Sequence, residues 1–413
     1  MIPWQLFVAV IATLHSTTSA EQLPLKGPYT PYPWIHKFAS LGDSYAAGLG
    51  AGSRIDWLCS RYNESYPNIL HTSFLGHHPK RTHQFLACTG AASTEIAEKQ
   101  ASALQDDLDL LTISAGGNDV GLTVILNNCI YQFFMAGEDD CDLAIQDARE
   151  RIANKTQLYK NVTQLFDAVK PKMNKDHGVV YVTGYAGFFG TDDELCNNVT
   201  WAVWKAVESS QKSQYLTLDR RVALDSLVRS VNIVLRQAAE AAGPNFHFID
   251  YDAHIKASRG RYCESGVLEP APNRRELDFY EWDTVDTGEN RTELQHETGD
   301  DVPKGSFEGG IAERINKTLQ EHPDWEWDPD KGFVNKSKTG VGGKGEEGEM
   351  GVVGDTISWM LPDSWKRVFH LRPRAHALIA ELILEDLRSR EAGRRKVVPD
   401  EGPGEGEHAE LRR

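Results

Sequence analysis

Five short apolar runs, each ending in glycine or turn-forming residues, are the feature that most limits how this chain folds. They read WIHKFASLG, HQFLACTG, LDLLTISAGG, GVVYVTGYAG and NFHFIDYD. Runs of this length are typical of buried strands. Helical patterns lie between and after them, with apolar residues at three-to-four spacing over 218–241 and again after Pro373. Strands that alternate with helices predict a parallel sheet covered on both faces.

Three of these runs end beside residues that carry chemistry. Ser44 follows the first run, Gly90 ends the second, and Asn118 follows the third. Ligands of parallel sheets bind beyond the carboxyl ends of the strands, so we expect the three residues to share one crevice. Taken singly, each has a plainer interpretation: a strand-end turn for Ser44, a loop for Gly90 and a strand-to-helix turn for Asn118.

Together the three residues fit nucleophilic catalysis on a carbonyl group. A hydroxyl nucleophile needs a base, and donors aimed at the oxyanion that develops. The Asn118 side chain and the backbone N–H groups of Ser44 and Gly90 are the candidate donors, and a glycine leaves the backbone open to a substrate oxygen. Asp43 and Asp119 are expected to cap turns and helix starts.

Four blocks in order resemble the SGNH, or GDSL-type, hydrolase superfamily: GDSY, TGA, GGND and RVFHLRPRAH, spanning about residues 38–388. The resemblance implies a three-layer α/β/α sandwich of the flavodoxin-like type and hydrolysis of esters. It also implies Ser44 as nucleophile, His370 as general base, an oxyanion hole of Ser44, Gly90 and Asn118, and no metal or cofactor. His376 and His254 are the rival bases, the first inside the last helical pattern and the second near Asp252.

The histidine block departs from the superfamily pattern Asp-x-x-His-Pro. Arg367 stands where the acid is usual, and Leu371 stands where the proline is usual. An imidazole base needs a group that holds its tautomer, normally a carboxylate. We expect a backbone carbonyl, that of Arg367, to do this, as in the Ser-His dyads of the secreted branch; Asp363 is a more remote candidate.

Several features predict secretion. Residues 1–20 have the length of a signal peptide and end in small residues. The six cysteines are even in number and lack CxxC spacing. Resemblance to the secreted branch implies the pairs Cys59–Cys88, Cys129–Cys141 and Cys196–Cys263. Seven sequons predict glycosylation, at Asn63, Asn154, Asn161, Asn198, Asn290, Asn316 and Asn335.

The charge is unevenly distributed. The formal net charge is −16, and residues 281–350 contribute 18 Asp and Glu against 8 Lys and Arg. We expect one hydrolase domain over 21–390, with this acidic Gly-rich segment as a peripheral insertion, within a stretch from 268 that has a loop-like composition. Trp325 and Trp327 either pack on the core or touch a ligand. Residues 391–413 are expected to form a disordered charged tail.

The sequence therefore predicts a secreted, glycosylated serine esterase that acts on lipid or cell-wall carbohydrate acyl esters. No Gly-x-Ser-x-Gly motif is present, which disfavours the other common serine-esterase architecture, and no His-Glu-x-x-His motif is present, which disfavours a zinc hydrolase. Net acidity argues against a nucleic-acid partner. We expect a monomer without a stable membrane anchor. The alternative is a catalytically inactive glycan- or lipid-binding protein on the same fold. Only the absence of an acidic residue at position 367 favours it.

Overall fold

The structure is a computed structural model that describes residues 32–76, 78–132, 140–153, 157–202, 212–281, 284–285, 307–328, 332–336 and 367–397. Several expectations lie outside these residues: the signal peptide over 1–20, the sequons at Asn154 and Asn290, Asp363, and the tail beyond residue 397. Among the described residues, no helix combines the length and apolarity that crossing a bilayer requires.

A five-stranded parallel sheet forms the centre of the molecule, and its strands are the five predicted runs. The strand order is β4-β1-β5-β6-β7, with every pairing parallel. The bounds are β1 (Lys37–Gly42), β4 (Thr82–Phe85), β5 (Leu110–Ser114), β6 (Val179–Thr183) and β7 (Phe246–Ile249). β1 lies between β4 and β5, so the direction of strand succession reverses there, at the position where open α/β sheets form their ligand crevice.

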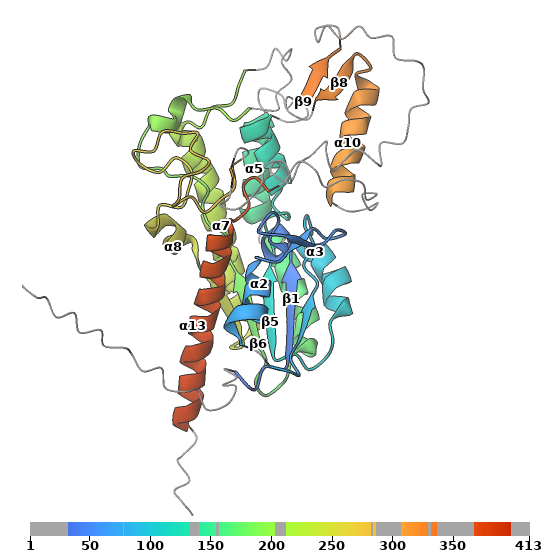
Figure 1. The fold of residues 1–413 in the computed structure, drawn as a ribbon, viewed down its shortest axis with the longest axis vertical. Helices are drawn as coiled ribbons and strands as arrows, with labels where there is room; N and C mark the ends of the chain where they lie inside the picture. The colour runs from blue at the N-terminus through green and yellow to red at the C-terminus, as the bar shows by residue number, and fades with distance from the viewer. Residues whose placement is uncertain are drawn as a thin grey trace, which may run out of the picture.

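Helices cover both faces of the sheet, because every residue of β5 and β6 is buried. α13 packs against α2 and contacts β7, while α6 packs against α3 and α7. Figure 1 shows α13 running the length of the sheet on one side. The predicted three-layer α/β/α fold is confirmed. The helices have the following bounds: α1 (Ser44–Ala47), α2 (Tyr66–Ile69), α3 (Ser93–Glu95), α4 (Leu122–Leu126), α5 (Asp140–Ala153), α6 (Leu158–Val169), α7 (Leu218–Ala242), α8 (Asp252–Ala257), α10 (Phe307–Glu321) and α13 (Pro373–Val397).

Part of the segment with loop-like composition is regular structure. It contains α10 and a hairpin of β8 (Trp325–Asp328) and β9 (Gly332–Asn335), which lie away from the central sheet (Figure 1). Ile311, Ile315 and Leu319 recur every four residues, a helical period that the acidic composition obscured. Trp325 and Trp327 are half-buried and pack against the hydrophobic core. The stretches 288–301 and 340–351 lie outside the described residues.

The last helix extends further than predicted. α13 continues to Val397, so residues 391–397 are helical and not part of a disordered tail. Glu, Ala, Arg and Lys in this stretch are good helix formers, and they prolong a helix that is already packed.

Three disulfides hold loops around the sheet, and their pairing is the one that the resemblance implied. They join Cys59 to Cys88, Cys129 to Cys141 and Cys196 to Cys263. Cys59 lies in the turn of a small hairpin formed by β2 (Arg54–Asp56) and β3 (Arg61–Tyr62), and Cys88 precedes the glycine block. The first disulfide therefore ties the hairpin to the loop that carries Gly90.

Candidate active site

The nucleophile block is shaped by close contact between β1 and β5. Gly42 has φ of +142°, and a Cβ atom there would lie 2.5 Å from the carbonyl oxygen of Ser114. Only glycine fits this position. Asp43 then caps α1, because its carboxylate accepts the Tyr45 N–H at 2.9 Å. Ser44 is the first residue of α1 and is 8% exposed, so its hydroxyl lies at the carboxyl edge of the sheet.

A second side chain reaches this serine from 326 residues further along the chain. His370 Nε2 lies 2.7 Å from Ser44 Oγ. Its other ring nitrogen, Nδ1, lies 3.1 Å from the carbonyl oxygen of Val368. A carbonyl only accepts hydrogen bonds, so these partners assign the ring proton to Nδ1 and leave Nε2 as an acceptor for the serine hydroxyl.

The carbonyl that contacts His370 Nδ1 belongs to Val368, one residue after Arg367, whose carbonyl was expected there. The Arg367 carbonyl accepts the backbone N–H of His370 at 2.9 Å and also acts to raise the pKa of the imidazole, but the hydrogen-bond contact of Nδ1 is with the Val368 carbonyl. The Arg367 side chain is buried, donates to the carbonyl of Thr284 at 2.7 Å, and lies 4.1 Å above the Tyr280 ring. Phe369, between Val368 and His370, has a left-handed backbone conformation with φ of +64°.

The histidine loop is held on two sides. On one side it pairs with the chain before Glu281: Phe369 N–H donates to the Tyr280 carbonyl, and Tyr280 N–H to the His370 carbonyl, both at 2.9 Å. On the other side Tyr45 donates its hydroxyl to the Phe369 carbonyl at 2.8 Å. The left-handed conformation of a bulky residue costs about 1–3 kcal/mol. Burial of the Phe369 ring offsets this cost. The ring packs among five aromatic side chains, those of Tyr131, Phe188, Phe189, Trp201 and Tyr262.

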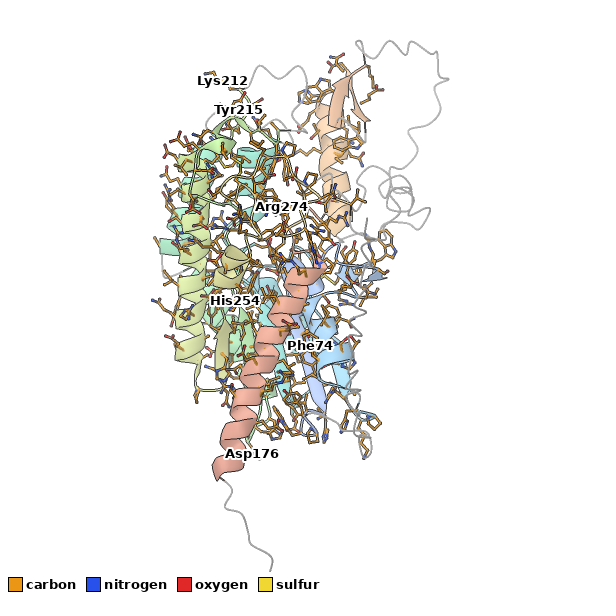
Figure 2. All side chains as sticks on the ribbon, turned by 60° about the vertical axis from the view of Figure 1, so that its left-hand side comes forward. Phe74, Asp176, Lys212, Tyr215, His254 and Arg274 are labelled. Carbon is orange, nitrogen blue, oxygen red and sulfur yellow. A yellow bond between two sulfur atoms is a disulfide. The ribbon has the colours of Figure 1, made fainter. Side chains whose placement is uncertain are left out.

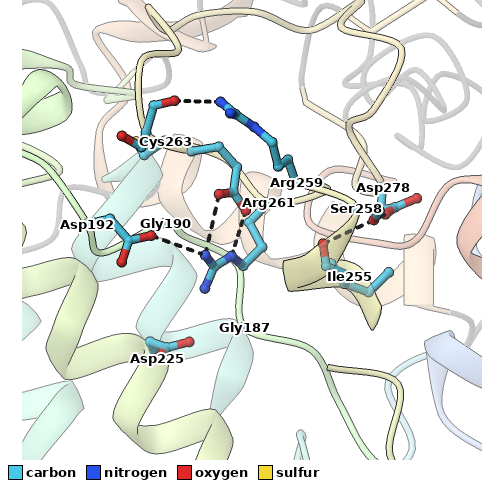
Figure 3. Close-up of polar contacts among 12 residues, drawn as sticks. Gly187, Gly190, Asp192, Asp225, Ile255, Ser258, Arg259, Arg261, Cys263 and Asp278 are labelled. Atoms are coloured by element: carbon cyan, nitrogen blue, oxygen red, sulfur yellow. Dashed lines mark hydrogen bonds and ion pairs between the residues drawn. The ribbon is translucent and has the colours of Figure 1, made fainter. Parts of the chain in front are cut away.

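One buried ion pair and one buried carboxylate lie in the segment that leads to the chain paired with this loop (Figure 3). Arg261 donates to Glu264 at 2.8 Å and lies 4.0 Å from Asp192. Asp278 accepts from Ser258 at 3.2 Å, and its own carbonyl accepts the backbone N–H of Arg372 at 2.8 Å. Asp278 also forms an ion pair with Arg374 at 2.8 Å, so both buried carboxylates of this segment have a charged partner, as buried charges must.

Burial sets the protonation of the two titratable groups next to Ser44. It lowers the pKa of His370 to about 4, although the hydrogen bond to the Val368 carbonyl acts in the opposite direction. It raises the pKa of Asp43 to about 6, although the hydrogen bond from Tyr185 opposes this. At neutral pH the imidazole is therefore uncharged and can accept a proton.

Gly90 and Asn118 lie at the ends of the strands on either side of β1. Gly90 is exposed and has φ of +85°. The Asn118 amide donates to the carbonyl of Ala91 at 3.0 Å, and Cys88 N–H donates to the Gly42 carbonyl at 2.9 Å. These bonds connect the serine, glycine and asparagine blocks to one another.

Neither rival histidine shares this geometry. His376 is fully buried in α13, and its Nδ1 accepts the backbone N–H of Tyr66 at 3.3 Å. His254 is exposed on α8 (Figure 2). Of the three candidate histidines, all of which the structure describes, His370 is the one with a ring nitrogen within hydrogen-bond distance of the serine hydroxyl. In the ranges that the structure describes, no cluster of His, Cys, Asp and Glu is arranged to hold a metal ion.

Comparison with known proteins identifies the family. Residues 40–267 match the GDSL-like Lipase/Acylhydrolase family. The chain is a member of this family. A lipase from Streptomyces rimosus is 30% identical over 215 residues, which cover 52% of this chain and 69% of the relative. Lipase 1 from Streptomyces coelicolor is 27% identical over 211 residues, covering 51% and 68% respectively.

A solved structure is also similar. The crystal structure of an extracellular lipase from Streptomyces rimosus has a TM-score of 0.44 and 27% identity, covering 55% of this chain and 85% of that one. The family match and the lipase relatives make this GDSL-like acylhydrolase a carboxylic ester hydrolase.

Two residues that contact the site of this acylhydrolase were not singled out from the sequence. Tyr185 donates to Asp43 at 2.5 Å, and Tyr45 holds the histidine loop. A signal for Tyr185 was present, because it lies at the end of the fourth apolar run, two residues after β6, and so at the same edge of the sheet as Ser44.

The described sequons differ in environment. Asn63 and Asn198 are exposed, while Asn316 and Asn335 are half-buried. Asn161 is half-buried within α6, and its amide donates to Asp119 at 3.0 Å. Asp119 also accepts from the backbone and hydroxyl of Ser93 at the start of α3, as its capping role predicted.

Proposed function

We propose that this acylhydrolase is a serine esterase in which Ser44 is the nucleophile and His370 the general base. The observation that carries the proposal is the 2.7 Å contact between Ser44 Oγ and His370 Nε2, on a ring whose Nδ1 faces the Val368 carbonyl. Nucleophile, base and orienting group are thus in the order that acyl transfer requires.

The reaction has two stages. Ser44 Oγ attacks the ester carbonyl while its proton passes to His370 Nε2. The oxyanion is stabilised by the backbone N–H groups of Ser44 and Gly90 and by the Asn118 amide, whose second N–H remains after the bond to Ala91. The intermediate collapses, the alcohol leaves with the proton from His370, and the acyl group stays on Ser44. Water then attacks the acyl-enzyme, again through His370, and releases the acid.

A carbonyl in place of the usual carboxylate changes the energetics of the base. It fixes the tautomer, but it stabilises the imidazolium less, because a carbonyl oxygen carries only a partial negative charge and a carboxylate carries a full one. A low pKa of the free imidazole is consistent with that weaker support. We infer that catalysis depends more on the oxyanion donors than in a full triad.

An apolar pocket supports lipid esters over carbohydrate esters as substrates. It is lined by Gly117, the residue before Asn118, and by residues of α4 and α7. Apolar side chains from both sides line it, including Val120, Leu122 and Ile125 on one side and Leu224, Leu227 and Val228 on the other. Such a lining fits an acyl chain, because each buried methylene contributes about 0.8 kcal/mol. It offers a sugar no hydrogen-bonding partners from these side chains.

The pocket can be tested by filling it. Val228→Trp should lower kcat/KM for a p-nitrophenyl decanoate at least about tenfold more than for the acetate, since only the longer chain needs the space. Val222→Trp is the matched control on the same helix, because Val222 is 43% exposed. Equal losses for the two esters would show that the acyl chain lies elsewhere.

We further infer that the enzyme is secreted and glycosylated. The three disulfides support an oxidising compartment, as do the exposed sequons at Asn63 and Asn198.

The alternative, an inactive binding protein, is separated from an esterase by one assay. Purified protein should hydrolyse p-nitrophenyl butyrate, and Ser44→Ala should reduce kcat by several orders of magnitude. No turnover by the unaltered protein would favour the binding role.

A further inference from the structure

Tyr185, which follows β6, has its backbone fixed by one side chain. Its N–H donates to Asn232 Oδ1 at 2.9 Å, and its carbonyl accepts from Asn232 Nδ2 at 2.8 Å. Asn232 is buried in α7. A backbone donor and a backbone acceptor leave one orientation for the amide, so Tyr185 is held rigidly against α7.

The Tyr185 hydroxyl joins two blocks of the site. It donates to Asp43 Oδ2 at 2.5 Å and accepts the Gly117 N–H at 3.1 Å. Asp43 immediately precedes Ser44, and Gly117 immediately precedes Asn118. One oxygen atom therefore connects the neighbour of the nucleophile to the neighbour of the oxyanion amide.

The ring of Tyr185 extends the connection to the base. It packs edge-on against Tyr45, with centroids 5.1 Å apart and planes at 82°. Tyr45 in turn holds the Phe369 carbonyl, one residue before His370. Tyr185 thus contacts, directly or through one residue, the neighbours of Ser44, Asn118 and His370.

We propose that Tyr185 is a positioning residue that holds the nucleophile and the oxyanion amide at a fixed separation. The inference rests on the proposed roles of Ser44 and Asn118. Tyr185 itself touches no reacting atom.

Loss of the hydroxyl has two consequences. Asp43 Oδ2 and the Gly117 N–H are both left without their partner in a buried setting, which favours movement of the two chain segments. A displacement of about 1 Å in a reacting group can cost on the order of 100-fold in rate. Tyr185 also lines the acyl pocket, but Phe keeps the aromatic ring there, so substrate binding should change little. The signature of the role is a fall in kcat with little change in KM.

The test compares Tyr185→Phe with Tyr251→Phe. Tyr251 is equally buried, and its hydroxyl has no hydrogen-bond partner among the described residues, so its removal controls for the loss of a buried hydroxyl. Rates on p-nitrophenyl butyrate are divided by the concentration of sites that a fluorophosphonate titrates, so that only folded enzyme is counted. Tyr185→Phe should lower kcat about 10- to 100-fold with KM within about threefold, and Tyr251→Phe should lower neither.

A double variant tests the route of the effect. If Tyr185 acts through Asp43, the loss in Asp43→Asn/Tyr185→Phe is smaller than the product of the two single losses. A kcat of Tyr185→Phe equal to that of Tyr251→Phe overturns the inference and leaves the proposed function intact. Unchanged turnover in Ser44→Ala instead overturns the proposed function, so the two failures are distinguishable.

Discussion

His370 Nδ1 lies 3.1 Å from the carbonyl oxygen of Val368, a residue of its own loop. The group that faces Nδ1 of this proposed base is therefore a backbone carbonyl, and no side-chain substitution removes it directly. A substitution can, however, disturb the conformation of the loop that positions this carbonyl. That conformation includes the left-handed turn at Phe369.

The first prediction concerns this carbonyl. Val368→Ala keeps the carbonyl and should leave kcat within a few-fold of the unaltered enzyme, whereas His370→Ala should cost about 10⁴-fold or more, as expected for loss of a general base. Steady-state kinetics on p-nitrophenyl butyrate measures both. A loss in Val368→Ala as large as that in His370→Ala, in protein that unfolds at the same temperature, would contradict the assignment.

The second prediction concerns pH. Because burial lowers the pKa of His370 to about 4, the base is unprotonated down to that pH, and kcat/KM should fall on the acid side with a midpoint well below 6.5. Asp43, with its pKa raised to about 6 by burial, also titrates in this range. Asp43→Asn removes that second group, so the limb that remains belongs to His370. A midpoint at 6.5 or above in this variant would argue against a buried base.

The third prediction concerns stability. Burial, with the nearby charge of Glu269, raises the pKa of Glu281 from 4.5 to about 8. Between these values the unfolded chain releases a proton that the folded protein keeps, so stability falls as pH rises, by about 1.4 kcal/mol per pH unit. Glu281→Gln lacks this loss, and its free energy of unfolding relative to the unaltered protein should rise from pH 5 to pH 8.

Urea unfolding at pH 5, 6.5 and 8 measures the effect. Glu276→Gln, an exposed glutamate on the same segment, is the matched control for removing a surface charge. A stability difference for Glu281→Gln that does not change with pH would show that Glu281 is ionised in the folded state.

The fourth prediction concerns glycosylation. In protein secreted from a eukaryotic host, glycopeptide mass spectrometry should find glycans on the exposed Asn63 and Asn198. Asn161 should have low occupancy, because its amide nitrogen points inward to Asp119 from a half-buried position in α6. High occupancy at Asn161 would mean that this hydrogen bond is absent from the secreted protein.

Much of the sheet could be predicted because its strands are short and apolar. Each strand is followed by glycine or turn-forming residues, which the backbone conformation at the end of a strand favours. Gly42 shows this clearly, since the contact with Ser114 excludes a side chain. Sequence reasoning brought Ser44, Gly90 and Asn118 to one edge of the sheet for the same reason: consecutive parallel strands all end there.

Other features depended on three-dimensional detail that the sequence does not encode locally. The Val368 carbonyl is the hydrogen-bond contact of His370 Nδ1, in a loop where Phe369 has a positive φ angle that its residue type rarely adopts. Tyr185 was overlooked because its contacts with Asp43 and Gly117 join segments far apart in the chain. The helix α10 was missed because a strongly acidic composition concealed a modest apolar period.

The central claim is that Ser44, activated by His370, forms the acyl-enzyme. Its most direct test is to label the protein with a fluorophosphonate and map the modified residue by peptide mass spectrometry, with His370→Ala and the exposed-histidine variant His254→Ala in parallel. A single adduct on Ser44, formed much more slowly in His370→Ala but at an unchanged rate in His254→Ala, is the result expected here. An adduct on another serine, or labelling of Ser44 that does not depend on His370, would contradict the claim.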